Sequence, residues 1–462
     1  MNQPHRPGTL LRHPVAIVGA VIATATSVAF LALLVAALLG LFSNPYAGLV
    51  VFVALPAAFV AGLLLIPLGM WLQRRRLQRH PDAPTDWPVI DLRDRRIRRS
   101  ALAFVALTAV NVVILLIAGY GSLHWMDSPV FCGQTCHTPM HPQFAAWQNG
   151  QHARIACAAC HIGEGAQGFV HAKLNGVHQL VSVSTNSFAR PIPPGAVPPT
   201  GGFQATCQTC HQPGRTPGDV VRVIRTYADD EKNTETNTVM LMHVGRGSPG
   251  GHGIHWHADA DTRVEYASSD GGRQTIPYVR VTKPNGEVKE YFADGTKHDA
   301  VPDDQLRRMD CVDCHNMVGH RIASTPELAV DRALAASEAM RQLPFSRRES
   351  VKLLKATYSS DDEALQTIDR GLRSFYESQG HAIDQAALLK TIEAVQNAYR
   401  HNVFPVMKVT WGSYPDNTGH NVSPGCFRCH DGSHSAKDGS SISADCELCH
   451  KQVDNPQAAA HP

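Results

Sequence analysis

The sequence predicts a mainly α-helical membrane anchor of three transmembrane helices. A loop-rich domain with a small β-rich insertion and a C-terminal helical segment is expected to follow it. Two observations predict this division: three long apolar runs lie in residues 1–122, and all 12 cysteines of the 462-residue chain lie beyond residue 130. The chain has 42 Lys and Arg against 40 Asp and Glu, so its charge balance gives no indication of a nucleic-acid partner.

Each of the three apolar runs is long enough to span a bilayer as a helix. They cover residues 15–42, 48–71 and 101–120 and contain no charged residue, and a membrane helix needs about 20 such residues. The first run exceeds the roughly 7–15 apolar residues of a cleaved signal peptide, and a second run follows it closely. We therefore expect a retained membrane anchor over residues 1–122.

Basic residues set the expected orientation of this anchor. Arg6 and Arg12 precede the first run, "RRRLQR" (74–79) follows the second, and "RDRRIRR" (93–99) precedes the third. Cytoplasmic loops of membrane proteins carry an excess of Lys and Arg. The N-terminus is therefore expected in the cytoplasm, and the chain after residue 120 on the periplasmic side of a bacterial inner membrane.

The cysteines form six pairs, and a histidine directly follows each pair. We number these motifs 1 to 6 in chain order. They are Cys132, Cys136 and His137; Cys157, Cys160 and His161; Cys207, Cys210 and His211; Cys311, Cys314 and His315; Cys426, Cys429 and His430; and Cys446, Cys449 and His450.

A C-x-x-C-H motif is the attachment site of a c-type haem, in which the two thiols bind the porphyrin and the histidine binds the iron. Six such motifs with no cysteine left over predict six covalently bound haems. Zinc sites need four ligands shared between motifs, and disulfides do not explain the histidines. Motif 1 has three residues between its cysteines, and we interpret it as a haem site with one residue bulged out.

The other axial ligand of each iron is expected among the remaining histidines and one methionine. Histidines that lie near other motifs are the first candidates, and the "HGIHWH" cluster and "LMHVG" segment add more. A histidine four or five residues after a proximal ligand is expected to reach a neighbouring haem. The candidates are Met140, His152, His243, His255 or His257, His320, His420 and His434.

Composition divides the chain beyond the anchor into four further regions. Residues 123–215 hold three motifs in loop-rich chain, and residues 216–305 are rich in β-branched and aromatic residues, with Asn285-Gly286 as a hairpin signal. Residues 306–404 contain motif 4 and helical patterns, with Thr325 and Ser360 as expected N-caps. Residues 405–462 hold the last two motifs.

The stretch "FCGQTCHTPM…WQNGQHARIACAACHIGEGAQGFVHAKLNG" resembles the start of NapC/NirT-type membrane-anchored quinol dehydrogenases. The segments around motifs 4 and 5 resemble the extended three-span inner-membrane cytochromes of the ImcH type. The resemblance implies that His152 is a distal ligand and that Lys173 belongs to a quinol pocket. Motif 1 departs from the family pattern, because three residues separate its cysteines and Met140 follows His137 by three positions instead of two.

The resemblance implies a quinol dehydrogenase that takes electrons from menaquinol or ubiquinol in the membrane and passes them to a periplasmic cytochrome or reductase. Two other functions fit the residues. The chain could be a non-catalytic electron-transfer subunit whose extra spans bind partner membrane subunits. It could also be a terminal reductase of nitrite-like oxyanions, which requires one iron with an open face.

Overall fold

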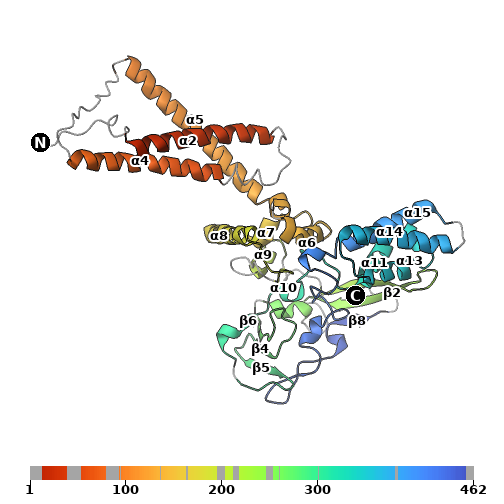
Figure 1. The fold of residues 1–462 in the computed structure, drawn as a ribbon. Coiled ribbons are helices and arrows are strands. Elements are labelled where there is room, and N and C mark those ends of the chain that lie inside the picture. The colour runs from red at the N-terminus through yellow and green to blue at the C-terminus, as the bar shows by residue number, and fades with distance from the viewer. Residues whose placement is uncertain are drawn as a thin grey trace. The chain divides into compact units, whose positions relative to one another are not determined.

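The computed structural model describes residues 13–38, 54–79, 93, 95–135, 137–162, 165–194, 203–211, 218–245, 253–259, 261–299, 301–379 and 383–453. The chain divides into two compact units, Met1–Thr135 and Cys136–Pro462. Each unit is described by itself, and the elements are labelled in Figure 1.

The first unit contains three long helices, α2 (Pro14–Leu38), α4 (Leu55–Arg79) and α5 (Arg95–Met126), and the short π-helix η2 (Phe131–Thr135). α2 and α4 pack side by side (Figure 1). Small residues allow this close approach, because a Cβ on Gly19 would lie 2.7 Å from the Gly62 carbonyl oxygen. Close packing through glycine is typical of helix pairs in membranes.

Among the described residues of this unit, one helical segment, Leu55–Arg76, is both long and apolar enough to cross a membrane. The segment Pro14–Phe30 of α2 is also apolar but shorter. These helices support a helical membrane anchor. The count of three spans stays a prediction.

The second unit begins with helices that carry or follow the residues of motifs 1 to 3. These are α6 (His137–Gln148), α7 (Cys157–His161), α8 (Gly165–Ser184) and α9 (Phe203–Gln208). Motifs 4, 5 and 6 likewise lie on single turns, namely α10 (Cys311–Cys314), η7 (Gly425–Arg428) and η8 (Cys446–Leu448). Each described cysteine pair of this unit therefore lies on a short helix or turn, which holds both sulfurs on one side of the chain.

Two antiparallel sheets form the β-rich part. One has the order β1-β2-β8, with β1 Asp219–Tyr227, β2 Glu235–His243 and β8 His450–Gln452. The other has the order β6-β3-β4-β5-β7, with β3 Arg263–Ala267, β4 Tyr278–Thr282, β5 Val288–Ala293, β6 Arg307–Arg308 and β7 His434–Ser435. Gly286 turns the β4–β5 hairpin at φ +83°. β7 and β8 come from the region of motifs 5 and 6, so this region is built into both sheets.

A helical segment follows motif 4. It contains α11 (Pro326–Ala336), α12 (Glu338–Gln342), α13 (Ser346–Lys355), α14 (Asp361–Ser378) and α15 (Gln385–Arg400). Thr325 and Ser360 cap α11 and α14, as predicted, because their hydroxyls accept hydrogen bonds from the amides of Leu328 and Glu363 at 3.2 Å. The Glu363 carboxylate accepts from the Ser359 amide.

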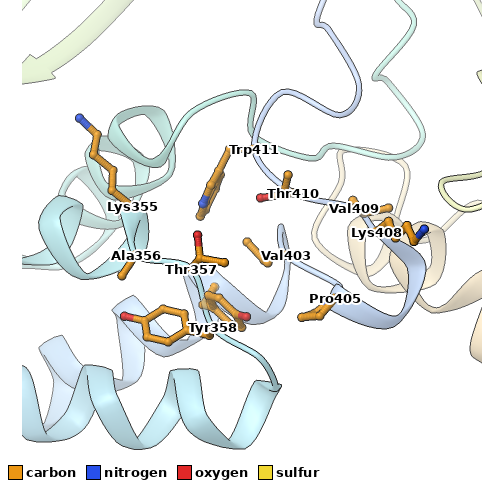
Figure 2. Close-up of a pocket in the computed structure, with 11 residues that line it drawn as sticks. Lys355, Ala356, Thr357, Tyr358, Val403, Pro405, Lys408, Val409, Thr410 and Trp411 are labelled. Atoms are coloured by element: carbon orange, nitrogen blue, oxygen red, sulfur yellow. The ribbon is translucent and has the colours of Figure 1, made fainter.

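A cavity of about 380 Å³ lies where this helical segment meets the following chain (Figure 2). The Trp411 indole closes one side and donates a hydrogen bond to the Leu354 carbonyl at 3.0 Å. Its lining contains no residue of a cysteine motif; the lining residues are 355–358, 399, 403, 405 and 408–411.

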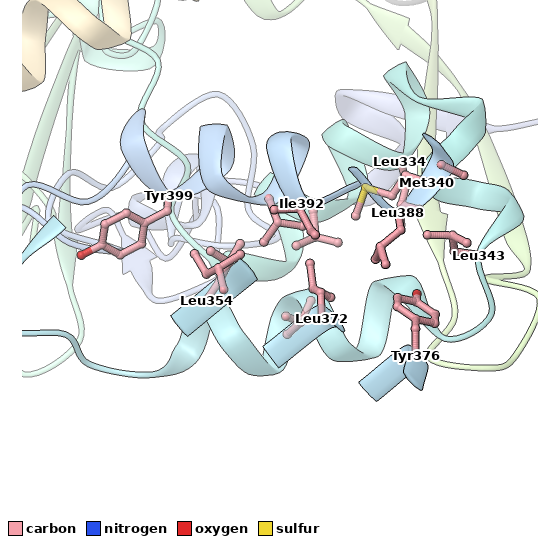
Figure 3. Packing of buried hydrophobic residues seen from close by; sticks show 14 of the residues in the cluster. Leu334, Met340, Leu343, Leu354, Leu372, Tyr376, Leu388, Ile392 and Tyr399 are labelled. Atoms are coloured by element: carbon pink, nitrogen blue, oxygen red, sulfur yellow. The ribbon is translucent and has the colours of Figure 1, made fainter. Parts of the chain in front are cut away.

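The helical segment has its own apolar core (Figure 3). Leu354 of α13, Leu372 of α14 and Val395 of α15 are each 0% exposed. Apolar residues repeat at helical spacing on these helices, so each contributes one face to the shared core. This core contains no motif residue, and its stability is expected to be independent of haem attachment.

Replacing Leu372 with alanine is expected to lower the free energy of unfolding of the helical segment by roughly 2–5 kcal/mol, because it removes a fully buried side chain and leaves a cavity. Leu389→Ala is the matched control. Leu389 is 53% exposed on α15, so its replacement should lower the free energy of unfolding far less. Denaturant unfolding followed by far-UV circular dichroism measures both. Equal losses for the two variants would contradict the described core.

Candidate haem-binding sites

The histidines of motifs 2 to 6 are each paired with a second imidazole from elsewhere in the chain. Their ring centres lie 5.8–6.2 Å apart. The pairs are His161 with His320, His211 with His152, His315 with His255, His430 with His257, and His450 with His420.

This separation matches the dimensions of a metal held between two imidazoles. A metal–imidazole bond is about 2 Å long and the ring nitrogen lies about 1.1 Å from the ring centre, so two opposed rings have centres about 6 Å apart. Two imidazoles are the protein's complete contribution to a haem iron, because the porphyrin supplies the other four nitrogens. Among the described residues no group of three or more His, Cys, Asp or Glu could hold a metal ion.

Backbone carbonyls orient three of these imidazoles through Nδ1. The Nδ1 atoms of His320, His257 and His430 lie 2.9, 2.8 and 2.8 Å from the carbonyl oxygens of residues 143, 254 and 443. A ring that donates from Nδ1 keeps Nε2 unprotonated, which is the arrangement of a metal-bound histidine. These three side chains are therefore prepared to ligate through Nε2.

Burial favours the neutral form of three paired histidines. It lowers the pKa of His255, His257 and His320 below the ordinary value. A neutral imidazole is the form that binds a metal, so burial favours ligation over protonation at these positions.

His255 and His257 lie in one 3₁₀ turn, η4 (Ile254–Ala258). The sequence led us to expect a ligand from one of them, whereas both are paired, with His315 and His430 respectively. The turn therefore reaches motif 4 with one imidazole and motif 5 with the other. Residues two apart in a 3₁₀ turn point in different directions, because each residue turns about 120°.

His434 and His243 have different surroundings. His434 is 2% exposed, and its Nε2 lies 2.7 Å from the Ile276 carbonyl oxygen inside the five-stranded sheet. The Nδ1 of His243 lies 3.0 Å from an Asp219 carboxylate oxygen. The His243 amide donates to the Cys449 carbonyl of motif 6 at 2.9 Å. The Nε2 atom of His434, which a ligand would offer to the iron, is therefore already in a hydrogen bond. His243 lies beside motif 6.

Motif 1 is described only in part. Cys132 is half-buried, whereas Cys136 and the His137 side chain lie outside the described residues. Met140 is half-buried in α6, three residues after the position of His137.

The motifs of the second unit adjoin one another in chain order. The charges of Cys207 and Cys210 raise the pKa of Cys160, after the larger effect of burial, so motif 2 lies near motif 3. A hydrogen bond from the Cys311 thiol lowers the pKa of Cys207 to about 7, which joins motif 3 to motif 4.

The same relation continues to motif 6. Burial raises the pKa of Cys314 to about 11, and the charge of Cys426 contributes to this rise, so motif 4 lies near motif 5. Burial and then the charge of Cys426 raise the pKa of Cys449, so motif 5 lies near motif 6.

An exposed aromatic ring, Phe427, stacks on His420 with ring centres 4.2 Å apart.

Lys173 lies on α8 and is half-buried. The helix begins four residues after His161, the histidine of motif 2. Lys173 therefore lies on the first helix after motif 2.

Comparison with known proteins identifies the family. Residues 95–191 match the N-terminal region of the NapC/NirT cytochrome c family. The chain is 36% identical over 459 residues to the cytochrome c-type protein ImcH of Geobacter sulfurreducens. The alignment covers 96% of this chain and 88% of ImcH. The chain belongs to the ImcH family of c-type cytochromes. No solved structure matches it.

Membership of the ImcH family makes the chain a membrane-associated multihaem c-type cytochrome that acts in electron transfer. The cysteine motifs and the imidazole pairs are the parts of this chain that fit that function. The NapC/NirT match ends at residue 191, so it includes motifs 1 and 2 and Lys173. The remaining motifs lie in the part that is similar to ImcH.

Proposed function

We propose that the chain holds six covalent haems and that those of motifs 2 to 6 are each ligated by two histidines. The five imidazole pairs with ring centres about 6 Å apart support this most strongly. His152, His255, His257, His320 and His420 are the proposed distal ligands. His434 is instead assigned to the sheet, and His243 to a supporting position beside motif 6.

For the haem of motif 1, Met140 remains the candidate ligand by sequence, although its spacing of three residues from His137 departs from the family pattern. An unligated face would leave this iron open to a small molecule. The other five irons would have both axial positions filled, which disfavours a terminal reductase of oxyanions at motifs 2 to 6.

The chain-order contacts support a single row of redox centres. Neighbouring thiols link motif 2 to 3, 3 to 4, 4 to 5 and 5 to 6. Bound haem supplies one-electron transfer at each position. We propose that electrons enter near motif 1 and leave near motif 6 to a periplasmic cytochrome or reductase.

The proposed electron donor is a quinol of the membrane, menaquinol or ubiquinol. Its oxidation releases two protons as well as two electrons, so the site needs a polar group that orients the quinol oxygen or relays its proton. Lys173 is the proposed group, because it lies on the first helix after motif 2 and within the NapC/NirT match. We also propose three spans, a cytoplasmic N-terminus and a periplasmic haem domain, from the charge pattern described above.

Lys173→Met is expected to reduce quinol-dependent haem reduction at least about tenfold, which is the low end of the contribution of a positioned proton-transfer group. Reduction by a small soluble reductant should be unchanged, because the haems themselves are intact. Stopped-flow absorbance of the purified full chain in lipid vesicles measures both reactions.

Lys390→Met is the matched control, because Lys390 is an exposed lysine on α15. An unchanged quinol rate in Lys173→Met would contradict the proposed role of Lys173. If the wild-type chain accepts electrons only when other membrane subunits are added, it is a non-catalytic subunit of a larger complex.

A further inference from the structure

α8 carries an apolar stripe that is exposed in the described part of the chain. Val170, Leu174, Val177 and Val181 are 54%, 66%, 61% and 55% exposed. Their spacing of three and four residues places them on one face of the helix. The stripe is about 16 Å long at 1.5 Å per residue.

The helix packs only weakly against the other elements that the structure describes. α8 forms no extensive contact with any other described helix or strand. An isolated helix of 20 residues is only marginally stable in water, and most helices in proteins depend on the burial of an apolar face. The exposed stripe therefore needs a surface to cover it.

The charges of α8 favour an anionic surface as that partner. Its sequence, "GAQGFVHAKLNGVHQLVSVS", contains no Asp or Glu. Its cation is Lys173, directly beside Leu174 of the stripe, and His171 and His178 are exposed on the same helix. An apolar face flanked by basic residues is the pattern of a helix that lies in the headgroup region of a membrane.

Chain connectivity also favours a lipid surface over a separate protein. The same chain contains the membrane-crossing segment Leu55–Arg76 and belongs to a membrane-associated family. α8 begins only 39 residues after α5 ends at Met126. A lipid surface is thus always present at high effective concentration near this helix, whereas a protein partner would have to be recruited.

We propose that α8 is an interfacial helix that lies on the bilayer with its Val170–Val181 stripe in contact with lipid. This would add a second membrane contact to the anchor. It would also place Lys173 at the boundary between lipid and water, whether or not the chain oxidises quinol.

The test uses the full-length, haem-loaded chain in vesicles of phosphatidylcholine and phosphatidylglycerol that contain a phospholipid with a photoactivated carbene group on its acyl chain. After irradiation and proteolysis, mass spectrometry measures the labelled fraction of each peptide. The peptide of α8 is expected to carry severalfold more label than the peptide of β5. The β5 peptide is the control, because its Val288 is also exposed, at 56%.

Val177→Asp should remove most of the α8 label and leave that of Leu55–Arg76 unchanged. An α8 peptide that is unlabelled while Leu55–Arg76 is labelled would overturn the proposal, and so would equal labelling of α8 and β5. If the Val177→Asp chain fails to acquire haem, the comparison of α8 and β5 labelling in the wild-type chain still tests whether α8 contacts lipid. None of these readouts depends on quinol oxidation, so either proposal can fail alone.

Discussion

Replacing His257 with methionine is expected to raise the reduction potential of one haem by on the order of 0.1 V and to leave the others unchanged. A thioether ligand favours reduced iron more than an imidazole does. His257 is the proposed distal ligand of motif 5, because its ring centre lies 5.8 Å from that of His430. A redox titration followed by optical absorbance, with the wild type in parallel, measures the shift.

His434→Gln is the control for this variant. His434 is 2% exposed, and its Nε2 lies within hydrogen-bond distance of the Ile276 carbonyl oxygen. A glutamine side-chain amide can replace that donor. The control should leave every haem potential unchanged. A shift in His434→Gln and none in His257→Met would reverse the ligand assignment.

Gly425→Ala is expected to prevent the turn that carries motif 5 from forming, at a cost of roughly 3 kcal/mol or more. Gly425 has φ +50°, and a Cβ at this position would overlap the carbonyl oxygen of Gly419. The same oxygen accepts a hydrogen bond from the Cys426 amide at 3.3 Å. Because the new Cβ and the Gly419 carbonyl oxygen must move apart, we expect Cys426 to be displaced and haem attachment at motif 5 to fall.

Gly439→Ala separates the clash from the backbone conformation. Gly439 also has a positive φ, +84°, but nothing lies within 4 Å of a Cβ built on it. The Gly439→Ala variant should lose only about 1–2 kcal/mol of folding stability, from the backbone conformation alone. It should keep its full haem content. Peptide mass analysis of haem attachment compares the two variants. Full attachment in Gly425→Ala would contradict the described turn.

The local parts of the proposed haem sites can be predicted from the sequence alone. Cys-x-x-Cys-His is a contiguous motif, so the thiols and proximal histidines of motifs 2 to 6 are readable from spacing alone. The second imidazole is not local: His161 is paired with His320, and His211 with His152. Which histidine approaches which motif depends on the folded chain. His434 illustrates the limit, because its spacing after motif 5 resembles that of His320 after motif 4.

The fold shows the same division between local and distant signals. The N-caps Thr325 and Ser360 lie as expected from short patterns. Asn285-Gly286 does lie in the β4–β5 hairpin, but the expected type I′ turn is wrong, because only Gly286 of the two residues has a positive φ. The sheets were predicted as an insertion of their own, whereas β7 and β8 join them from residues 434–435 and 450–452. Strands of two or three residues carry too little alternation of polar and apolar residues to be predicted.

The intact mass of the mature chain tests the central claim most directly, because each attached haem adds one fixed increment to the mass of the polypeptide. The chain purified from membranes is expected to carry six increments, one for each cysteine pair. A mass that shows fewer than six, or an unmodified polypeptide, would contradict the proposal that every motif holds a haem in a continuous row.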